Sequence, residues 1–231
     1  MPNRSTISRI DCAAVLFDLD GVLVDSTAYI ERQWRDWAAA KGLDATPFLR
    51  YCHGRRAVET IRLAAPLLDA EDEVARFREQ AVDERVPLVA ISGARELLYA
   101  LPASRWAVVT SGARRFALAR LAGADLSKPR VLVSAEDVRE GKPSPAGYLR
   151  AAELLGVAPS ACVAFEDAPV GIEAARAAGA IVFALSTTHS SSELSGALVV
   201  LESLTYVHLV TSPAGDRPLS LELGSAPAIT A

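Results

Sequence analysis

Side chains that can do chemistry follow several short apolar runs of this chain. They are carboxylates, a hydroxyl-bearing turn and one lysine: Asp18, Asp20, Thr110, Ser111, Gly112, Lys142, Glu166 and Asp167. In open α/β sheets, ligands bind beyond the carboxyl ends of the strands. We therefore expect these residues to meet at one edge of a parallel sheet.

This set of residue types favours phosphoryl transfer with a divalent cation. Crowded carboxylates repel one another unless a cation lies among them, and oxygen ligands suit Mg²⁺. A carboxylate at a strand end can attack phosphorus, and a second one two residues further on, as in Asp18 and Asp20, can pass protons. Lys142 and the turn at 110–112 can hold the oxygens of the phosphate.

Apolar runs predict the strands that position these residues. The runs are 13–17, 106–109, 131–133, 161–165, 181–185 and 197–201. Their continuous apolar character is typical of strands that are covered on both faces. Segments of helical length, rich in Ala and Leu, separate the later runs. The pattern predicts right-handed βαβ units and a doubly wound parallel α/β sheet.

The first strand is followed by about 85 residues before the next clear strand. This stretch has helical character over 26–41, 57–68 and 71–86. We interpret 27–86 as an inserted α-helical cap domain, and 1–26 together with 87–211 as the core domain. The alternative is one large core without a separate lid. Residues 212–231 have little periodicity and are expected to form a loosely ordered tail.

Composition excludes several classes of protein. The 231 residues include 24 Lys and Arg against 28 Asp and Glu, a formal net charge of −4, which argues against binding nucleic acid through a basic surface. Three widely spaced cysteines fit neither a disulfide framework nor a thiolate zinc site, and they favour a cytoplasmic protein. Neither an apolar leader nor a run of about 20 apolar residues is present, so we expect no membrane association. We also expect a monomer.

Four segments resemble the motifs of the haloacid dehalogenase superfamily. They are FDLDGVLVDS (17–26), VVTSG (108–112), GKPSPAGYL (141–149) and FEDAPVGIEAARAAGA (165–180). The resemblance covers about residues 13–210, and it implies a Rossmann-like core with a helical cap inserted after the first strand. Within the superfamily, the chain is most similar to phosphatases of small sugar and polyol phosphates, such as glycerol-phosphate and 2-deoxyglucose-6-phosphate phosphatases.

The resemblance also implies roles for the acidic residues. Asp18 would be the nucleophile and Asp20 the general acid and base. Asp18, the backbone carbonyl of Asp20 and Asp167 would hold Mg²⁺, and Glu166 would ligate the ion directly or through water. The substrate would be a small phosphorylated metabolite, which is hydrolysed through an aspartyl-phosphate intermediate.

The remaining motif residues would hold the phosphate group. Thr110 and Lys142 are the implied phosphate ligands, with Ser111 and Gly112 beside them, and Lys142 would also restrain the carboxylate of Asp18. The sequence departs from the superfamily pattern at Ala168, where Ser often follows the acidic pair. The sugar and polyol phosphatases tolerate this change.

Two other functions are weighed against a phosphatase. A hexose-phosphate mutase like the β-phosphoglucomutases would carry a His shortly after the first motif, where this chain has Ile30. A non-catalytic binding protein on the same fold would not need the complete set of Asp18, Asp20, Lys142 and Asp167. Both comparisons favour a hydrolase.

Within the expected cap, His53-Gly54-Arg55-Arg56 is the candidate for substrate selection. By its similarity to the His-Gly-x-Arg stretch of glycerol-phosphate phosphatase caps, Arg56 is the preferred substrate ligand, with His53 behind it. The alternative is that Arg55 and Arg56 are solvated residues at a helix start and that His53 only caps the helix.

Overall fold

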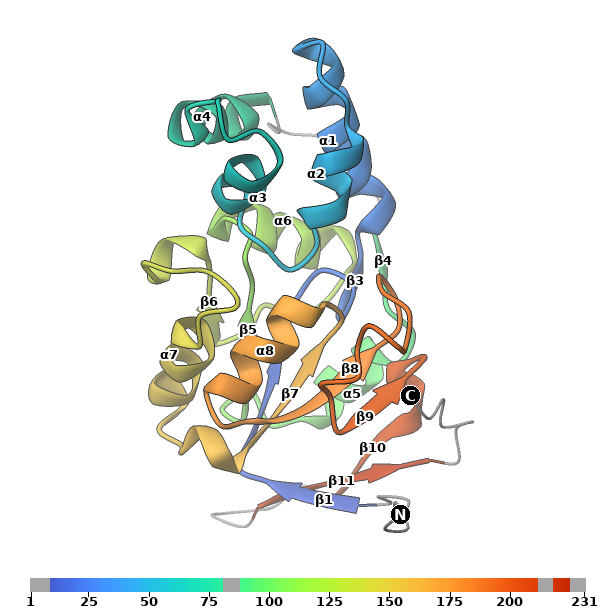
Figure 1. Cartoon of the computed structure of the whole chain (residues 1–231). Helices are drawn as coiled ribbons and strands as arrows, with labels where there is room; N and C mark the ends of the chain where they lie inside the picture. The colour runs from blue at the N-terminus through green and yellow to red at the C-terminus, as the bar shows by residue number, and fades with distance from the viewer. Residues whose placement is uncertain (1–8, 81–87, 212–217, 225–231) are drawn as a thin grey trace.

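The computed structural model describes residues 9–80, 88–211 and 218–224, and a parallel sheet lies at its centre (Figure 1). Its strand order is β6-β5-β2-β7-β8-β9, and every neighbouring pair is parallel. The strands are β2 (Ala14–Phe17), β5 (Trp106–Val109), β6 (Val131–Val133), β7 (Cys162–Glu166), β8 (Ile181–Leu185) and β9 (Val199–Leu201). All six predicted strands are therefore confirmed, with shifts of one or two residues at some ends.

Helices cover both faces of this sheet, which explains why its strands are apolar throughout. On one face, Val15 and Phe17 of β2 pack in a core that includes residues of α5 (Ala94–Ala100) and α6 (Arg114–Gly123). On the other face, Ala14 and Leu16 pack with residues of α7 (Ala146–Leu155) and α8 (Pro169–Ala177). Successive side chains of a strand point to opposite faces, so both sets must be apolar. The doubly wound, Rossmann-like fold is confirmed.

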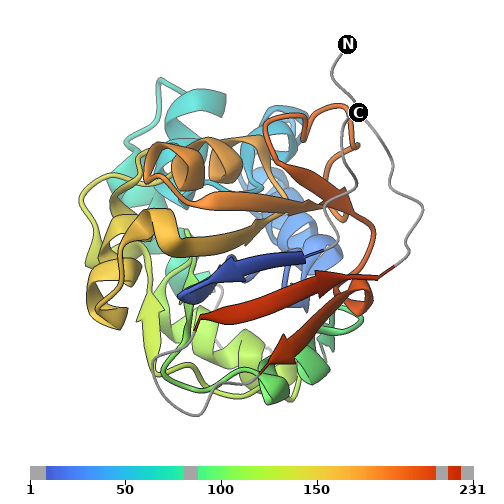
Figure 2. The same ribbon diagram turned by 90° about the horizontal axis from the view of Figure 1, so that it is seen from below.

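A second sheet includes a strand from the segment 212–231, which we expect to be a loosely ordered tail; that expectation is wrong for this strand, and 212–217 and 225–231 lie outside the described residues. Strand β11 (Leu219–Leu223) lies between β1 (Arg9–Cys12) and β10 (Val207–Thr211) and pairs antiparallel with both. Figure 2 shows the N-terminal strand beside the two C-terminal ones. Leu219 and Leu221 are fully buried in the core. The alternation of Leu219, Ser220 and Leu221 has the two-residue period of a strand. The segment is short, and the Pro, Gly and Ser residues on both sides of it favoured the expectation of a loop.

Among the described residues, four helices precede α5 between the first strand of the central sheet, β2, and the next one along the chain, β5. They are α1 (Thr27–Ala40), α2 (Thr46–Tyr51), α3 (Ala57–Ala64) and α4 (Ala70–Gln80). They stand together at one end of the molecule (Figure 1), and the short antiparallel pair β3 (Val24–Asp25) and β4 (Val89–Ala90) lies where the chain leaves and re-enters the core. Helix α2 was not predicted. The predicted helix 71–86 lies partly outside the described residues.

These four helices have a hydrophobic core of their own. Its centre is aromatic: the ring of Trp34 lies 5.7 Å from that of Trp37, 5.7 Å from that of Phe48 and 4.6 Å from that of Phe77. Both tryptophans are buried in this cluster, which is separate from the two clusters that flank the sheet. We use the word cap for helices α1 to α4. The exact domain boundaries at 26/27 and 86/87 stay a prediction.

None of the helices in the described part of the chain combines the length and apolar character needed to cross a membrane.

Candidate active site

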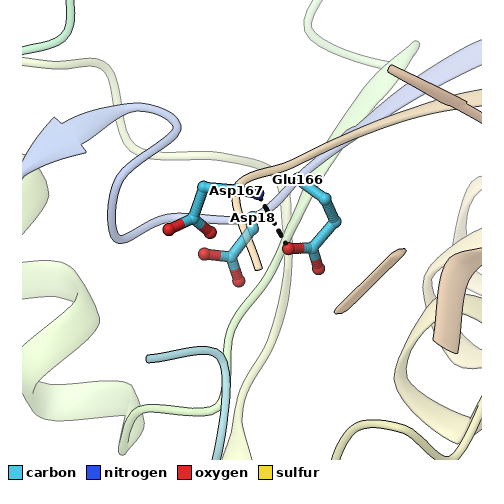
Figure 3. Close-up of side chains that lie close together, drawn as sticks. All are labelled: Asp18, Glu166 and Asp167. Carbon is cyan, nitrogen blue, oxygen red and sulfur yellow. Dashed lines mark hydrogen bonds between the residues drawn. The ribbon is translucent and has the colours of Figure 1, made fainter. Parts of the chain in front are cut away.

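The carboxyl ends of β2 and β7 bring three acidic side chains together. Asp18 directly follows β2, Glu166 is the last residue of β7, and Asp167 comes next. Because β2 and β7 are adjacent and parallel, with Phe17 opposite Phe165, these residues meet at the same edge. Figure 3 shows the three carboxyl groups side by side. One ligand oxygen from each lies within 4.8 Å of the others.

The acidic cluster is buried, and burial controls its protonation. Loss of solvation raises the pKa of Asp18 to about 7; the cation of Lys142 opposes this rise, and the carboxylate of Glu166 adds to it. Burial likewise raises the pKa of Asp167 well above its usual range, and the nearby Asp18 and Glu166 raise it further. Such a set of buried carboxylates needs positive charge if all are to be ionised.

Lys142 supplies one positive charge to this cluster. Its ammonium donates hydrogen bonds to Asp18 Oδ1 and, over 2.6 Å, to Glu166 Oε1. Only 5% of Lys142 is exposed. Burial alone would lower the pKa of Lys142, but the carboxylates of Asp18 and Glu166 outweigh that effect and raise it above its ordinary value. Lys142 is therefore a permanent cation that fixes the Asp18 carboxylate.

One oxygen of the cluster has no protein partner. Asp167 Oδ2 accepts a hydrogen bond from the Thr188 hydroxyl, whereas Asp167 Oδ1 has no partner among the described residues although it is buried. An unpaired buried carboxylate oxygen is costly unless a ligand satisfies it. Together with the all-oxygen donor set, this atom fits a hard divalent cation such as Mg²⁺.

Tyr148 is a contributor that sequence reasoning missed. Its hydroxyl donates to Glu166 Oε1, the oxygen that also accepts from Lys142. Burial, followed by the negative charge of Glu166, raises the pKa of Tyr148 well above its ordinary value, so the phenol stays protonated. The signal that could have revealed it is a polar aromatic residue on the otherwise apolar buried face of α7, beside Ala151 and Ala152.

The turn after β5 lies beside the acidic cluster. Thr110 follows the last residue of β5, and its hydroxyl accepts a hydrogen bond from the amide of Gly112 over 3.0 Å. The Ser111 hydroxyl donates over 2.8 Å to the carbonyl of Gly54 in the cap. The structure thus places the turn residues where they were predicted, but it also gives Ser111 a contact with the cap that the sequence did not indicate.

Asp20 is held from two sides. Its Oδ1 accepts a hydrogen bond from the Ser26 hydroxyl over 2.5 Å, and its Oδ2 accepts one from Arg120 over 2.6 Å. Ser26 immediately precedes α1, whereas Arg120 belongs to the core helix α6. Arg120 was not among the predicted site residues, because it lies 100 positions from Asp20 in the sequence and on a helix that reads as part of the core.

The two predicted cap residues lie near the site, and each has protein partners. Arg56 pairs with Glu59 over 2.5 Å and donates over 3.0 Å to the carbonyl of Arg139 in the core. His53 Nε2 lies 3.5 Å from a carboxylate oxygen of Glu31. Burial lowers the pKa of His53, so its ring is neutral at pH 7. In this arrangement Arg56 ties the cap to the core.

A cavity of about 420 Å³ opens between the cap and the sheet edge. Its lining includes residues from both sides: Asp18, Asp20, Ile30, Trp34, His53, Arg55, Arg56, Thr110, Ser111, Gly112, Phe116 and Arg120. This volume is at the small end of ligand pockets, which commonly span 300–1,000 Å³. The cavity is therefore large enough for a small molecule, and Asp18 and Asp20 are part of its lining.

Comparisons with known proteins agree with this geometry. The protein-family model for haloacid dehalogenase-like hydrolases matches residues 12–179. Hexitol phosphatase A of Escherichia coli is 39% identical over 210 residues, which cover 89% of this chain and 97% of that protein. 2-Deoxyglucose-6-phosphate phosphatase 2 of Saccharomyces cerevisiae is 35% identical, with 84% and 89% covered. A hydrolase from Pseudomonas syringae has a similar structure, with a TM-score of 0.73, 26% identity and coverage of 83% and 94%.

Proposed function

The chain belongs to the haloacid dehalogenase-like hydrolases, and we propose that it is a phosphatase of small sugar or polyol phosphate monoesters. The observation that carries this proposal is the buried Asp18, which lines the cavity, is fixed by Lys142 and is grouped with Asp167, one of whose oxygens has no partner among the described residues. The names of the two phosphatase relatives support the class of substrate.

Asp18 and Asp20 are the proposed reacting groups. In the first step, a carboxylate oxygen of Asp18 attacks phosphorus, the bond to the ester oxygen breaks, and a proton from Asp20 goes to the departing oxygen, which leaves as an alcohol. In the second step, the oxygen of a water attacks phosphorus while the bond from phosphorus to the Asp18 oxygen breaks. Asp20 takes the water's proton, inorganic phosphate leaves, and the free Asp18 carboxylate is restored. Both residues line the cavity, so one substrate can contact both.

Lys142 and the turn after β5 are the proposed holders of phosphate. Charge that spreads over the non-bridging oxygens during transfer is stabilised by donors that are fixed beforehand. The Thr110 hydroxyl and the amide of Ser111 are suitable donors at the cavity wall, and Gly112 lies beside them with its amide bound to the Thr110 hydroxyl. Lys142 acts from behind Asp18, because its ammonium already binds that carboxylate.

The residues that would hold Mg²⁺ are Asp18, the backbone carbonyl of Asp20, and Asp167. Glu166 fits a supporting role, because Oε1 accepts from both Lys142 and Tyr148 and Oε2 accepts from the amide of Asp167. When bound, the ion supplies charge that allows the carboxylates and a phosphate dianion to lie together. A preformed acidic cluster of this kind supports dependence on a divalent cation.

A mutase is not favoured. The position at which the β-phosphoglucomutases carry a guarding His is occupied by Ile30, whose side chain lines the cavity. An apolar side chain at this position cannot regulate proton transfer to the phosphoenzyme, so water that reaches the intermediate would complete hydrolysis.

The proposal extends to the setting in which the enzyme works. Cys12, Cys52 and Cys162 are all free and buried, which supports a reducing compartment such as the cytoplasm. We propose a monomer whose partner is a small phosphorylated metabolite rather than nucleic acid or a membrane.

A phosphate-release assay over a panel of sugar and polyol phosphates tests this function. The wild type is assayed with Mg²⁺ and with EDTA, and Asp18→Asn serves as the inactive control. We expect Mg²⁺-dependent release from hexitol, deoxyhexose or glycerol phosphates, and loss of at least about 10⁴-fold in Asp18→Asn. Equal rates in the wild type and Asp18→Asn would refute the proposal, and so would interconversion of sugar phosphates without phosphate release.

A further inference from the structure

The ion pair between Arg120 and Asp20 joins the first motif to a residue that lies outside all four motifs. The guanidinium donates over 2.6 Å to Asp20 Oδ2, and the exposed fractions of the two side chains are 13% and 20%. Ion pairs on the surface are screened by water and usually do little to restrain the orientation of their side chains. This pair is mostly withdrawn from solvent, so it can hold Asp20 in one orientation.

The two hydrogen-bond partners of Asp20 come from different directions. Ser26, which is 1% exposed, binds Oδ1 from the start of the cap, and Arg120 binds Oδ2 from the core helix α6. A carboxylate with one fixed donor on each oxygen has a defined plane. Proton transfer requires such a plane, because the transferring oxygen must lie at hydrogen-bond distance from the ester oxygen of the substrate.

Arg120 also lies next to the phosphate-holding turn. A methyl group added to Gly112 would lie 3.6 Å from a terminal nitrogen of Arg120, and the guanidinium lies 5.9 Å from the centre of the Tyr29 ring on α1. The guanidinium is therefore held between the cap helix, the turn after β5 and Asp20. Its stem comes from the core, so its position does not depend on a mobile loop.

We infer that Arg120 is a positioning residue, which acts through Asp20 by fixing the orientation in which Asp20 delivers its proton to the leaving oxygen. This inference rests on the proposed phosphatase function. It adds a residue outside the four motifs to the reaction. The bonds made and broken are those given above: the proton moves from Asp20 to the ester oxygen while the bond from phosphorus to that oxygen breaks.

The competing explanation is that Arg120 binds the substrate directly. Its side chain lines the cavity, and its Nε has no hydrogen-bond partner in the described part of the chain. The two roles predict different dependence on the leaving group. A residue that binds the substrate would raise kcat/KM equally for all esters of similar shape. A residue that orients the general acid would raise kcat/KM most for esters whose leaving oxygen needs a proton.

Phenyl phosphate and 4-nitrophenyl phosphate provide the comparison. They have similar shapes, but 4-nitrophenolate is a much weaker base than phenolate and leaves without a proton. We would measure kcat/KM, because it reports the steps up to the first phosphoryl transfer. We expect Arg120→Met to lower kcat/KM about 30-fold for phenyl phosphate and at most about threefold for 4-nitrophenyl phosphate. Arg120→Lys, which keeps the charge but not the planar fork, should recover part of the loss.

A double-variant cycle tests whether Arg120 acts through Asp20. In an Asp20→Asn background, we expect Arg120→Met to change kcat/KM for phenyl phosphate by less than about twofold, because the positioned acid is already absent. Arg114→Met is the matched control: it lies on the same helix, and its ion pair with Asp137 at 2.6 Å is outside the cavity. For both esters, the kcat/KM of this control variant should lie within about twofold of the wild-type value.

The outcomes separate this inference from the proposed function. Suppose that the wild type releases phosphate from both esters. The inference is then overturned, and the phosphatase function stands, if Arg120→Met lowers kcat/KM equally for both esters. The same holds if the reduction of kcat/KM in the double variant is the product of the reductions in the Arg120 and Asp20 single variants. If the wild type hydrolyses no phosphate ester with Mg²⁺, the proposed function itself fails. Thermal unfolding of each variant checks the fold, and Arg120→Gln carries the same comparison should Arg120→Met not fold.

Discussion

The ammonium of Lys142 lies 2.6 Å from Glu166 Oε1, and both side chains are buried behind Asp18, which lines the cavity. Lys142 binds Asp18 at the same time, so one cation compensates two carboxylates. The position of Asp18, at the end of β2, therefore depends on the charge of Lys142, which lies in the segment after β6, and on that of Glu166 at the end of β7.

Replacing Lys142 by Met should affect both stability and catalysis. Breaking a buried ion pair from one side leaves uncompensated charge, and we expect a loss of about 3–5 kcal/mol in the free energy of unfolding without Mg²⁺. We expect kcat to fall by at least about 100-fold. Urea unfolding and phosphate release measure the two effects. Arg150→Met, which removes an exposed pair with Glu153, should cost less than about 1 kcal/mol. Equal costs for the two variants would contradict this account.

Tyr148→Phe removes only the hydroxyl that donates to Glu166. Because Lys142 still binds the same oxygen, we expect a moderate loss of about 1–3 kcal/mol, which urea unfolding would detect. A variant as stable as the wild type would show that the phenol does not support Glu166.

Divalent cation binding should stabilise the fold through Asp167. A ligand that binds only the native state raises the unfolding temperature, and Mg²⁺ would also satisfy Asp167 Oδ1, which has no partner in the described part of the chain. We expect Mg²⁺ to raise the unfolding temperature of the wild type, but not that of Asp167→Asn, in a thermal-shift experiment with and without EDTA. The exposed Glu153→Gln is the control and should keep the full shift. A full shift in Asp167→Asn would argue that the ion binds elsewhere.

Gly21 and Gly42 form a matched pair for testing the space beside Asp167. Both have positive φ, +80° and +66°, so a Cβ strains either position by about 1–2 kcal/mol. At Gly21, however, the Cβ would collide with Asp167 Oδ2, whereas at Gly42 no atom of the described residues lies within 4 Å of it. We therefore expect the kcat of Gly42→Ala to equal that of the wild type. The kcat of Gly21→Ala should fall by at least about tenfold, and this variant should need a higher Mg²⁺ concentration to reach half of its maximal activity. Titrations of activity against Mg²⁺ would show this, and similar behaviour of the two variants would refute it.

Prediction from the sequence succeeded where one physical constraint acts locally. A strand covered on both faces must be apolar throughout, so runs such as 106–109 and 181–185 could be located almost to the residue. Polar residues directly after those runs had to lie at the sheet edge, which is why Asp18 and Thr110 were correctly placed there.

Prediction failed where position depends on packing between distant segments. Arg120 and Tyr148 reach the site from helices, and only the packing of α6 and α7 on the sheet decides which of their side chains point to the acidic residues. Strand β11 was missed because its partners, β1 and β10, lie about 210 and 10 residues away in the chain, and its five residues have no local signal strong enough to outweigh the Pro and Gly around them.

The most direct test of the central claim is the detection of a phosphoryl group on Asp18. The enzyme would be mixed with Mg²⁺ and a phosphate ester that it hydrolyses, quenched in acid within milliseconds, and digested for mass spectrometry, with Asp20→Asn included to slow breakdown of the intermediate. We predict that the peptide containing Asp18 gains the mass of one phosphoryl group, and that Asp18→Asn shows no such gain. Continued turnover with the Asp18 peptide unmodified in both the wild type and Asp20→Asn, or a phosphoryl group on another residue, would contradict the account.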